Sequence, residues 1–393
     1  MKVTGMEKRS VRTGTFLIIL IIFIKMLHIS KKSSKFAAKF VKTVKMKRNI
    51  AIIAGGDSSE HEVSIRSAAG LYGWMDKEKY DVTVVVLKGQ EWKAIPALDN
   101  GQWTMDNVSY PIDKNDFSFT RGGVKHRFDF AYITIHGTPG ENGILQGYLD
   151  MIGLPYSCCG VLAAALTFNK YACNHYLSYF GFRIANSMML RAGQKWPNAP
   201  KMAETLGLPC FIKSNVGGSS FGCTKVKTVE DIYPAIERAF QEGDEVICES
   251  FMQGTEVTCG VYKTKNKAVA FPITEVVTHN EFFDYDAKYK GEVDEITPAR
   301  IPDEVRDKIQ AETLRLYDII GANGIIRVDW IITPNGEWKL ENGQWKGDMP
   351  KINLLEVNTT PGMTPTSFIP QQIRAAGLDI TEVLSDIFEN KFN

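Results

Sequence analysis

The chain has 393 residues, of which 44% are hydrophobic, 23% charged and 11% aromatic. These are ordinary globular values, and they exclude a disordered, collagen-like or disulfide-scaffold protein. The length allows two or three domains with separate cores. The net charge of +1 hides an asymmetry, because residues 1–48 have a net charge of +12 and the remainder −11. An acidic body argues against nucleic-acid binding, which depends on basic contacts to phosphate.

Residues 1–48 are interpreted as a basic leader with a short apolar run at 16–24 (FLIILIIFI). A membrane-spanning helix needs about 20 apolar residues, so this run is too short to span. The basic residues that follow are suited to an anionic membrane surface. Two interpretations stay open: an over-extended start, because Met46 leads directly into the first predicted strand, or a membrane-associating leader. Membrane contact is expected only under the second.

Strands and helices alternate after the leader. Strands are predicted at residues 49–54 (NIAIIA), 81–87 and 129–134, with helices at 60–75 and 143–151. Alternation of this kind predicts a parallel α/β sheet with ligands at the carboxyl ends of its strands. Residues 49–158 are therefore expected to form an N-terminal substrate-binding α/β domain.

The pattern changes from Cys159 onward. Helices are predicted at 162–180, around 229–240, at 302–320 and near the C-terminus, where apolar residues recur with a 3.6-residue period. Strands are predicted at 208–213, 223–227, 245–249, 256–262, 268–277, 325–333 and 352–357, with a polar loop at 279–295 and a hairpin insertion at 335–351. The expected domains are a central one at 159–251 and a catalytic C-terminal one at 252–393.

A glycine-rich loop, IKSNVGGSSFGCTKV, runs from residue 212 to 226 between two predicted strands, with Lys213 at its entrance. Such a loop can line a phosphate with backbone N–H groups while the lysine neutralises charge. It is not a Walker A loop, because no GK[ST] opens a helix. A flexible hairpin turn explains the loop about as well.

Four polar residues lie at alternate positions on two predicted strands: Arg327 and Asp329 on one, Glu356 and Asn358 on the other. Residues two apart in a strand face the same side. Carboxylates with an amide oxygen suit Mg²⁺ bound to nucleotide phosphates, and Arg327 can hold charge that develops on an acyl group. The alternative is a structural ion pair with Arg327. We favour the metal, because one cation would leave the buried oxygens undersatisfied.

Three further motifs lie in predicted loops. Gly362 and Ser367 belong to the turn-rich run after the second of these strands, where a glycine permits close approach and a hydroxyl can bind a carboxylate. Glu60 begins a predicted helix, where a carboxylate either caps the helix or binds an ammonium group. His136 opens the loop HGTPGENG at a strand end.

Taken together and in order, these motifs resemble the D-alanine–D-alanine ligases of the ATP-grasp superfamily, from about Lys47 to the C-terminus. The set comprises GG-x-S-x-E-x-E-V-S, HG-x-x-GE-x-G, Lys213 with GGSS-x-G, FDY-x-AKY, R-x-D and E-x-NT-x-PGMT-x-x-S. The resemblance implies a three-domain α/β ATP-grasp fold: an N-terminal doubly wound parallel-sheet domain, a small central α+β domain and a C-terminal mixed-sheet domain.

The resemblance also implies an activity and a site. Two D-alanines would be joined at the expense of ATP through a D-alanyl phosphate, giving D-alanyl-D-alanine for peptidoglycan precursor synthesis. Mg²⁺ or Mn²⁺, as two ions, would be the metal. The residues matched to the family's motifs are, for ATP, Lys170, Lys213, Glu249 and Glu256; for metal, Asp329, Glu356 and Asn358; for substrate, His136, Gly362, Ser367 and Phe368; and for catalysis, Glu60, Ser219, Lys288, Tyr289 and Arg327.

In the family, Lys288 and Tyr289 would lie on a loop that closes over the site, with the tyrosine linked through Ser219 to Glu60. Closure would exclude water, which otherwise hydrolyses an acyl phosphate. Two departures are visible: the phosphate loop reads Lys-Ser-Asn-Val where many relatives have Pro after the Lys, and the 335–351 insertion lengthens the separation of Asp329 from Glu356.

Two rival functions are compatible with parts of this pattern. Another ATP-grasp carboxylate–amine ligase would share the phosphate loop and the metal strands, and would lack the motifs around Glu60 and Tyr289. A nucleotide-binding regulatory or membrane-anchored protein would use the basic leader, and the intact set of metal ligands argues against it. A cytoplasmic location is expected, since the seven cysteines form no CxxC pair. The resemblance further implies a homodimer.

Overall fold

The computed structural model describes residues 47–98, 101–217, 222–278, 293–335, 339–341, 344–346 and 348–392. The chain divides into two compact units, 1–47 and 48–393, and the second is described here. The expected leader therefore lies outside the described residues apart from its last two. Within the described residues, no helix is both long and apolar enough to cross a membrane.

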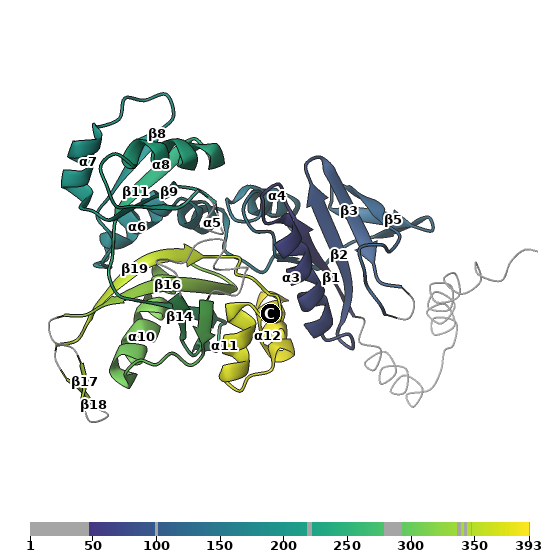
Figure 1. Cartoon of the computed structure of the whole chain (residues 1–393). Helices are drawn as coiled ribbons and strands as arrows, with labels where there is room; N and C mark the ends of the chain where they lie inside the picture. Colours follow the sequence, from purple (N-terminus) through teal and green to yellow (C-terminus); the bar gives the residue numbers. More distant parts are fainter. Residues whose placement is uncertain are drawn as a thin grey trace, which may run out of the picture. The chain divides into compact units, whose positions relative to one another are not determined.

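The first sheet has seven strands in the order β6-β5-β4-β3-β2-β1-β7. One end of it is parallel: β1 (Arg48–Gly55) pairs with β2 (Tyr80–Lys88) on one side and with the edge strand β7 (Phe130–Ile133) on the other. The last six residues of β1 are all buried, as a central parallel strand requires. Helices α3 (His61–Trp74) and α4 (Ile144–Ile152) follow β1 and β7 in the chain, and Figure 1 shows α3 lying alongside β1 and β2. The predicted elements of this region are confirmed.

The prediction of a parallel sheet is confirmed for these three strands and wrong for the rest of the sheet. Four further strands extend it antiparallel beyond β2: β3 (Glu91–Pro96), β4 (Tyr110–Asp113), β5 (Ser118–Arg121) and β6 (Val124–His126). At two of the four connections, between β2 and β3 and between β5 and β6, the physical reason is the turn, because two residues can join only antiparallel neighbours. Gly122 and Gly123, both with positive φ, form one such turn between β5 and β6.

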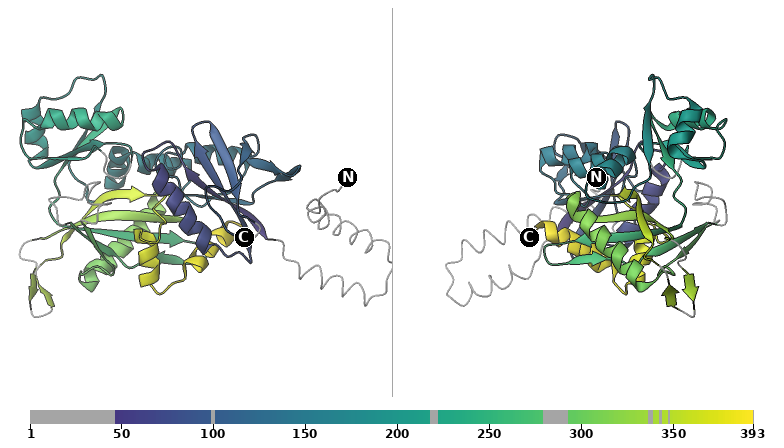
Figure 2. Two further views of the ribbon diagram at one scale, coloured as in Figure 1. Left: turned by 45° about the vertical axis from the view of Figure 1, so that its right-hand side comes forward. Right: turned by 90° about the vertical axis from the view of Figure 1, so that its left-hand side faces the viewer.

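The second sheet has four strands in the order β10-β9-β11-β8. They are β8 (Ser187–Arg191), β9 (Cys210–Ser214), β10 (Thr224–Val226) and β11 (Glu245–Ser250). Helices α7 (Ala199–Leu206) and α8 (Ile232–Ala239) share one apolar core with these strands, and the views in Figures 1 and 2 show both helices beside the sheet. Strand β9 alternates buried and half-buried residues, so its other face is available to a ligand.

The single helix predicted at 162–180 is two helices, α5 (Val161–Phe168) and α6 (Lys170–Ser178). Asn169 separates them in an extended conformation, and its side chain accepts a hydrogen bond from the Ala172 N–H. Asparagine competes with the helical backbone in this way and favours the N-cap position. The break places Lys170 at the first position of α6.

The third sheet has six strands: β15 (Val293–Ile296), β14 (Thr274–Thr278), β12 (Thr255–Lys263), β16 (Ile325–Thr333) and β19 (Lys351–Asn358) in spatial order, with β13 (Ala268–Ala270) paired to β12. Helices α10 (Asp303–Ile319), α11 (Phe368–Ala375) and α12 (Ile380–Phe392) accompany it. The predicted hairpin insertion is confirmed by the antiparallel pair β17 (Lys339–Glu341) and β18 (Gln344–Lys346). The strand predicted at 268–277 is two strands, β13 and β14.

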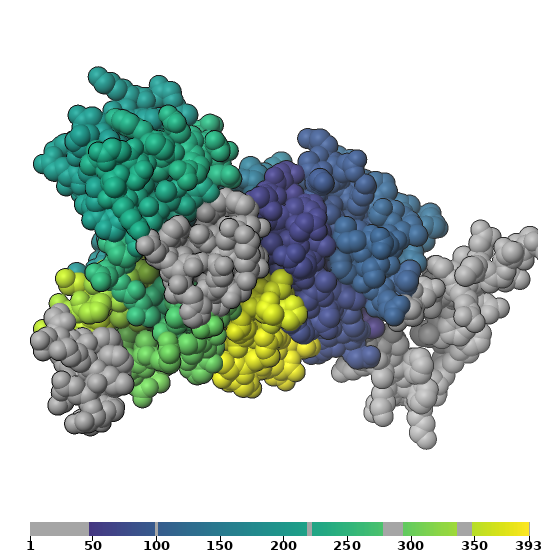
Figure 3. Space-filling view, viewed as in Figure 1, coloured from purple at the N-terminus to yellow at the C-terminus, as the bar shows by residue number. Residues whose placement is uncertain are grey.

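The end of the chain packs against its beginning. Phe388 of α12 makes an edge contact with Tyr80, with ring centroids 5.2 Å apart, and a tilted contact with Phe130 at 5.0 Å. The Met363 N–H donates to Ser67 Oγ of α3 at 3.2 Å. Figure 3 shows the purple surface of the early chain adjoining the yellow surface of its end. These contacts bring loops of the first sheet to the edge of the third.

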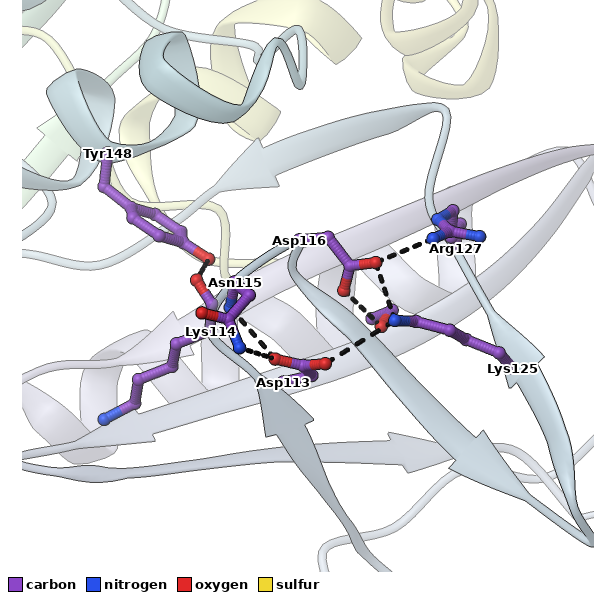
Figure 4. A network of polar contacts seen from close by, with 8 residues as sticks. Asp113, Lys114, Asn115, Asp116, Lys125, Arg127 and Tyr148 are labelled. Carbon is purple, nitrogen blue, oxygen red and sulfur yellow. Dashed lines mark hydrogen bonds and ion pairs between the residues drawn. The ribbon is translucent and has the colours of Figure 1, made fainter.

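A network of charged side chains holds the outer hairpins of the first sheet (Figure 4). Asp116 pairs with Lys125 and Arg127, each at 2.8 Å, and Asp113 accepts from the Asn115 side chain at 2.8 Å. Exposed ion pairs of this kind contribute little stability individually. They lie far along the sheet from β1 and β7, and we assign them a structural role in the hairpin.

Candidate functional site

One cavity of about 1780 Å³ is lined by residues of the second and third sheets and by the loops that follow β1 and β7 of the first sheet. Every candidate residue that the structure describes lines it. They are Glu60, His136, Lys170, Lys213, Glu249, Glu256, Arg327, Asp329, Glu356, Asn358, Gly362, Ser367 and Phe368. The remaining candidates, Ser219, Lys288 and Tyr289, lie outside the described residues.

The acidic candidates meet because β16 and β19 are adjacent and antiparallel. Asp329 is the direct register partner of Glu356, and Arg327 is the partner of Asn358. The Asn358 side-chain N–H donates to Asp329 Oδ2 at 3.2 Å and to Glu356 Oε1 at 3.4 Å. The predicted placement of these four residues on one face is therefore confirmed. It gathers two carboxylates and one amide at one point of the cavity wall.

Arg327 is ion-paired in this arrangement. Its Nε and Nη2 donate to the two oxygens of Asp329 at 2.9 and 2.8 Å, and Nη2 lies 4.0 Å from Glu356 Oε1. Burial lowers the pKa of Arg327, but Asp329 and then Glu356 outweigh it, so the net shift is upward. The ion pair with Arg327, which was the alternative to a metal site, is thus present. The carboxylates of Asp329 and Glu356 together offer more acceptor oxygens than this one guanidinium satisfies.

Two lysines approach the cavity from the second sheet and from α6. Lys213 Nζ lies 2.6 Å from Glu249 Oε2, and both side chains are largely buried. Burial lowers the pKa of Lys213, but Glu249 and other nearby groups raise it by more. The net shift of the pKa is upward, so the ammonium group stays cationic. Lys170 Nζ donates to the Gly217 carbonyl at 2.6 Å in the glycine-rich loop. Burial lowers the pKa of Lys170, a cost that an anion in the cavity would offset.

Glu60 occupies the N-cap position of α3, but its side chain makes no capping hydrogen bond. The capping interpretation is therefore wrong, and the carboxylate lines the cavity. His136 is 7% exposed, and its Nε2 has no hydrogen-bond partner among the described residues. A buried polar atom that lines a cavity without a protein partner suits contact with a bound ligand.

The turn after β19 and the start of α11 form another part of the wall. Ser367 is the N-cap residue of α11, and its Oγ accepts from the Thr364 N–H at 3.1 Å. A Cβ added at Gly362 would lie 2.9 Å from Ser367 Oγ, so only glycine fits there without displacement. The Arg327 guanidinium lies 5.3 Å from the centre of the Phe368 ring. The first N–H groups of α11 are thus placed near the acidic pair, where they can bind an anionic group.

Two residues that line the cavity were missed in the sequence. Glu141 lines the cavity and accepts from the Gly137 N–H at 2.7 Å. Burial and then the neighbouring Glu60 raise its pKa, while His136 lowers it. It belongs to the HGTPGENG loop, which was a usable signal. Thr258 also lines the cavity and lies in a β-strand of ordinary composition, which carried no such signal.

Comparison with known families covers most of the chain. The model described as the D-ala D-ala ligase N-terminus matches residues 49–159, and that of the D-ala D-ala ligase C-terminus matches residues 176–389. The chain is 62% identical over 347 residues to the D-alanine–D-alanine ligase of Bacteroides fragilis, which covers 88% of the chain and 100% of that protein. It is 52% identical over 344 residues to the ligase of Porphyromonas gingivalis, covering 88% and 98%.

Solved structures show the same similarity at lower identity. The VanG D-Ala:D-Ser ligase of Enterococcus faecalis matches with a TM-score of 0.74 and 29% identity, over 88% of this chain and 99% of that one. The D-alanyl-alanine synthetase A of Vibrio cholerae matches with a TM-score of 0.73 and 28% identity over the same shares. The two neighbours are named for different products, which makes the second amino acid a question for experiment.

Proposed function

Because the chain belongs to the D-alanine–D-alanine ligase family, we propose that it joins two D-alanines through a D-alanyl phosphate, with ADP and phosphate as by-products. The observation that carries the proposal is the single cavity lined by every described candidate residue. The product, D-alanyl-D-alanine, would serve peptidoglycan precursor synthesis. The expected division into domains at 49–158, 159–251 and 252–393 belongs to the same proposal.

ATP would bind between the second and third sheets. Lys213 and Lys170 would hold its phosphates, since both side chains line the cavity. Burial lowers the pKa of Lys170, and a bound phosphate would offset this cost. Glu249 and Glu256 would lie near adenine and ribose. When ATP binds, Lys213 would exchange part of its contact with Glu249 for phosphate oxygens, which also favour a cation.

The donor set of Asp329, Glu356 and Asn358 fits Mg²⁺ or Mn²⁺, because carboxylate and amide oxygens are hard ligands. We propose that these residues hold two such ions, and that the Asn358 amide, whose N–H faces the two carboxylates here, then turns to present its oxygen. Divalent cations bound there would neutralise charge on the transferring phosphoryl group. Arg327 would then be released in part from Asp329 to face the reacting carbonyl.

The first D-alanine would be held by its ammonium at Glu60, with Glu141 and His136 behind it. Its carboxylate oxygen would attack the γ-phosphorus, the bond to the β–γ bridging oxygen would break, and ADP would leave. The amine of the second D-alanine would then attack the acyl carbon, lose a proton and expel phosphate. Arg327 and the backbone at Gly362 would stabilise the oxyanion that forms in this step.

The second D-alanine would be held by its carboxylate at the start of α11, by Ser367 and the amide of Phe368. Ser219, Lys288 and Tyr289 would close the site against water, and this role is proposed from their motifs alone. We also propose a homodimer, as in the family. The exposed apolar residues Ile144 and Met151 of α4 and Leu162 of α5 support a partner surface there.

The experiment measures phosphate release with the full chain, ATP and Mg²⁺ against D-alanine, D-serine, other D-amino acids and D-lactate, with the products separated by mass. We expect phosphate release that depends on D-alanine and a dipeptide of two D-alanines. If phosphate release requires a different D-amino acid, the proposed substrate is wrong and the proposed class of ATP-dependent ligase stands. Phosphate release without any amino acid dependence would contradict the proposal.

A further inference from the structure

A row of polar side chains crosses the third sheet at the cavity wall. The register pairs Thr274 of β14 with Thr258 of β12, Thr258 with Asp329 of β16, and Asp329 with Glu356 of β19. Residues that are direct partners in a sheet project from the same face. Thr258 is 1% exposed and Thr274 is fully buried. The acidic pair is therefore the open end of a longer buried polar row.

The hydrogen bonds of Asp329 divide its two oxygens between the neighbouring strands. Thr258 Oγ1 donates to Oδ1 at 2.5 Å, and Arg327 Nε donates to the same oxygen at 2.9 Å. Oδ2 receives the Arg327 Nη2–H at 2.8 Å and the Asn358 side-chain N–H at 3.2 Å. Oδ1 is thus held toward β12, and Oδ2 is directed toward β19, where Glu356 lies.

The Thr258 segment of β12 is itself fixed from above by α11. Gln372 is fully buried; its Nε2 donates to the Thr258 carbonyl at 3.0 Å and to Thr274 Oγ1 at 3.1 Å. Its Oε1 accepts from the Gly260 N–H at 2.9 Å. A Cβ at Gly260 would lie 2.4 Å from Ile369 Cδ1, so the absence of a side chain lets the helix lie directly on the strand.

We propose that Thr258 is a positioning residue for the divalent cation site: its hydroxyl holds Asp329 Oδ1 so that Oδ2 faces Glu356. This inference rests on the proposed function, since the cation is proposed at that acidic pair. A neutral hydroxyl suits the task because it orients the carboxylate and leaves its charge available to a cation. Arg327, in contrast, orients Asp329 and competes for its charge.

The test uses three substitutions of one residue in the full chain. Thr258→Val keeps the shape and removes the hydroxyl, Thr258→Ser keeps the hydroxyl and removes the methyl, and Thr258→Ala removes both. Binding of Mn²⁺ in the presence of ADP, without D-alanine, is followed by the electron paramagnetic resonance signal of free Mn²⁺. Loss of a group that orients a metal ligand typically costs about 10- to 100-fold in metal affinity. We expect that loss for Val and Ala, and near wild-type binding for Ser.

Circular dichroism and the thermal midpoint check that each variant is folded. If Thr258→Val does not fold, the comparison of Thr258→Ser with Thr258→Ala isolates the effect of the hydroxyl. Mn²⁺ binding by a folded Val variant as tight as in the wild type would overturn the inference, as would equal losses in Ser and Ala. A wild type that binds Mn²⁺ with ADP and makes no dipeptide would overturn the proposed function and leave the role of Thr258 intact. No Mn²⁺ binding by the wild type would overturn both.

Discussion

Lys213 and Glu249 form a buried ion pair across neighbouring strands β9 and β11, with 2.6 Å between Nζ and Oε2. The pair lines the cavity where ATP is proposed to bind. It therefore has two separable consequences, one for folding and one for nucleotide binding. A buried pair is not in itself evidence of net stabilisation, but breaking it on one side leaves an uncompensated charge.

We expect Lys213→Met to lower the free energy of unfolding by about 3–5 kcal/mol, because Glu249 is left charged and desolvated. The double substitution Lys213→Met/Glu249→Gln should recover most of this loss in urea titrations. Affinity for ATP, measured by calorimetry, should stay low in both variants because the phosphate contact is gone. Full recovery of ATP affinity in the double variant would show that the pair is structural only.

Glu356→Gln should reduce turnover by about 10²–10³-fold or more, since a neutral amide replaces a proposed metal-bridging carboxylate next to a transferring phosphoryl group. Steady-state phosphate release over a range of Mg²⁺ concentrations provides the measurement. Glu382→Gln on the exposed side of α12 is the matched control and should keep wild-type activity. Near-normal turnover of Glu356→Gln at ordinary Mg²⁺ would remove Glu356 from the metal site.

Gly362→Ala should raise the KM for the second D-alanine on the order of 10-fold, corresponding to about 1–2 kcal/mol. The added Cβ would lie 2.9 Å from Ser367 Oγ and would displace the hydroxyl that is proposed to bind the carboxylate. Gly73→Ala is the control, because a Cβ at this exposed helical glycine meets nothing within 4 Å. It should leave KM unchanged and stabilise the fold by up to about 1 kcal/mol. Equal KM values in both variants would contradict the placement of the acceptor.

Glu141→Gln should change how stability depends on pH. Burial, followed by the nearby Glu60, raises the pKa of Glu141 in the folded state. The unfolded chain therefore loses this proton first as pH rises, and the wild type loses stability between the unfolded and folded pKa values. Below both pKa values, the free energies of unfolding of the variant and the wild type should differ least. Above both pKa values, the variant should be most stable relative to the wild type.

Urea unfolding between pH 4 and pH 8 measures this difference, with Glu230→Gln in an exposed position as the control. Glutamine can still accept the Gly137 N–H, so the loop geometry is kept. A relative stability of Glu141→Gln that is flat across the range, or that falls with rising pH, would contradict the assigned electrostatics. Ligase activity should fall in the same variant, because one carboxylate beside the proposed ammonium site is lost.

Local sequence was sufficient wherever one residue pattern decides the structure. The run at 50–54 is wholly apolar and forms the buried part of β1, and alternate positions placed Arg327 with Asp329 and Glu356 with Asn358 on one face. The antiparallel extension β3–β6 was missed, although Gly122-Gly123 signalled one of its two-residue turns. The helix break at Asn169 was missed because the flanking residues are helix-compatible on both sides and the cap depends on one side-chain hydrogen bond.

By itself the sequence determined the strand faces and, through its ordered motifs, the family. Only the tertiary structure decided which strand lies beside which. That placement makes Asp329 the partner of Glu356 and of Thr258 at once, joins Lys213 to Glu249, and seats Gln372 over Gly260. The reason is physical: the period of a strand fixes the side to which a residue points, whereas strand order, register and helix docking depend on contacts between residues far apart in the chain.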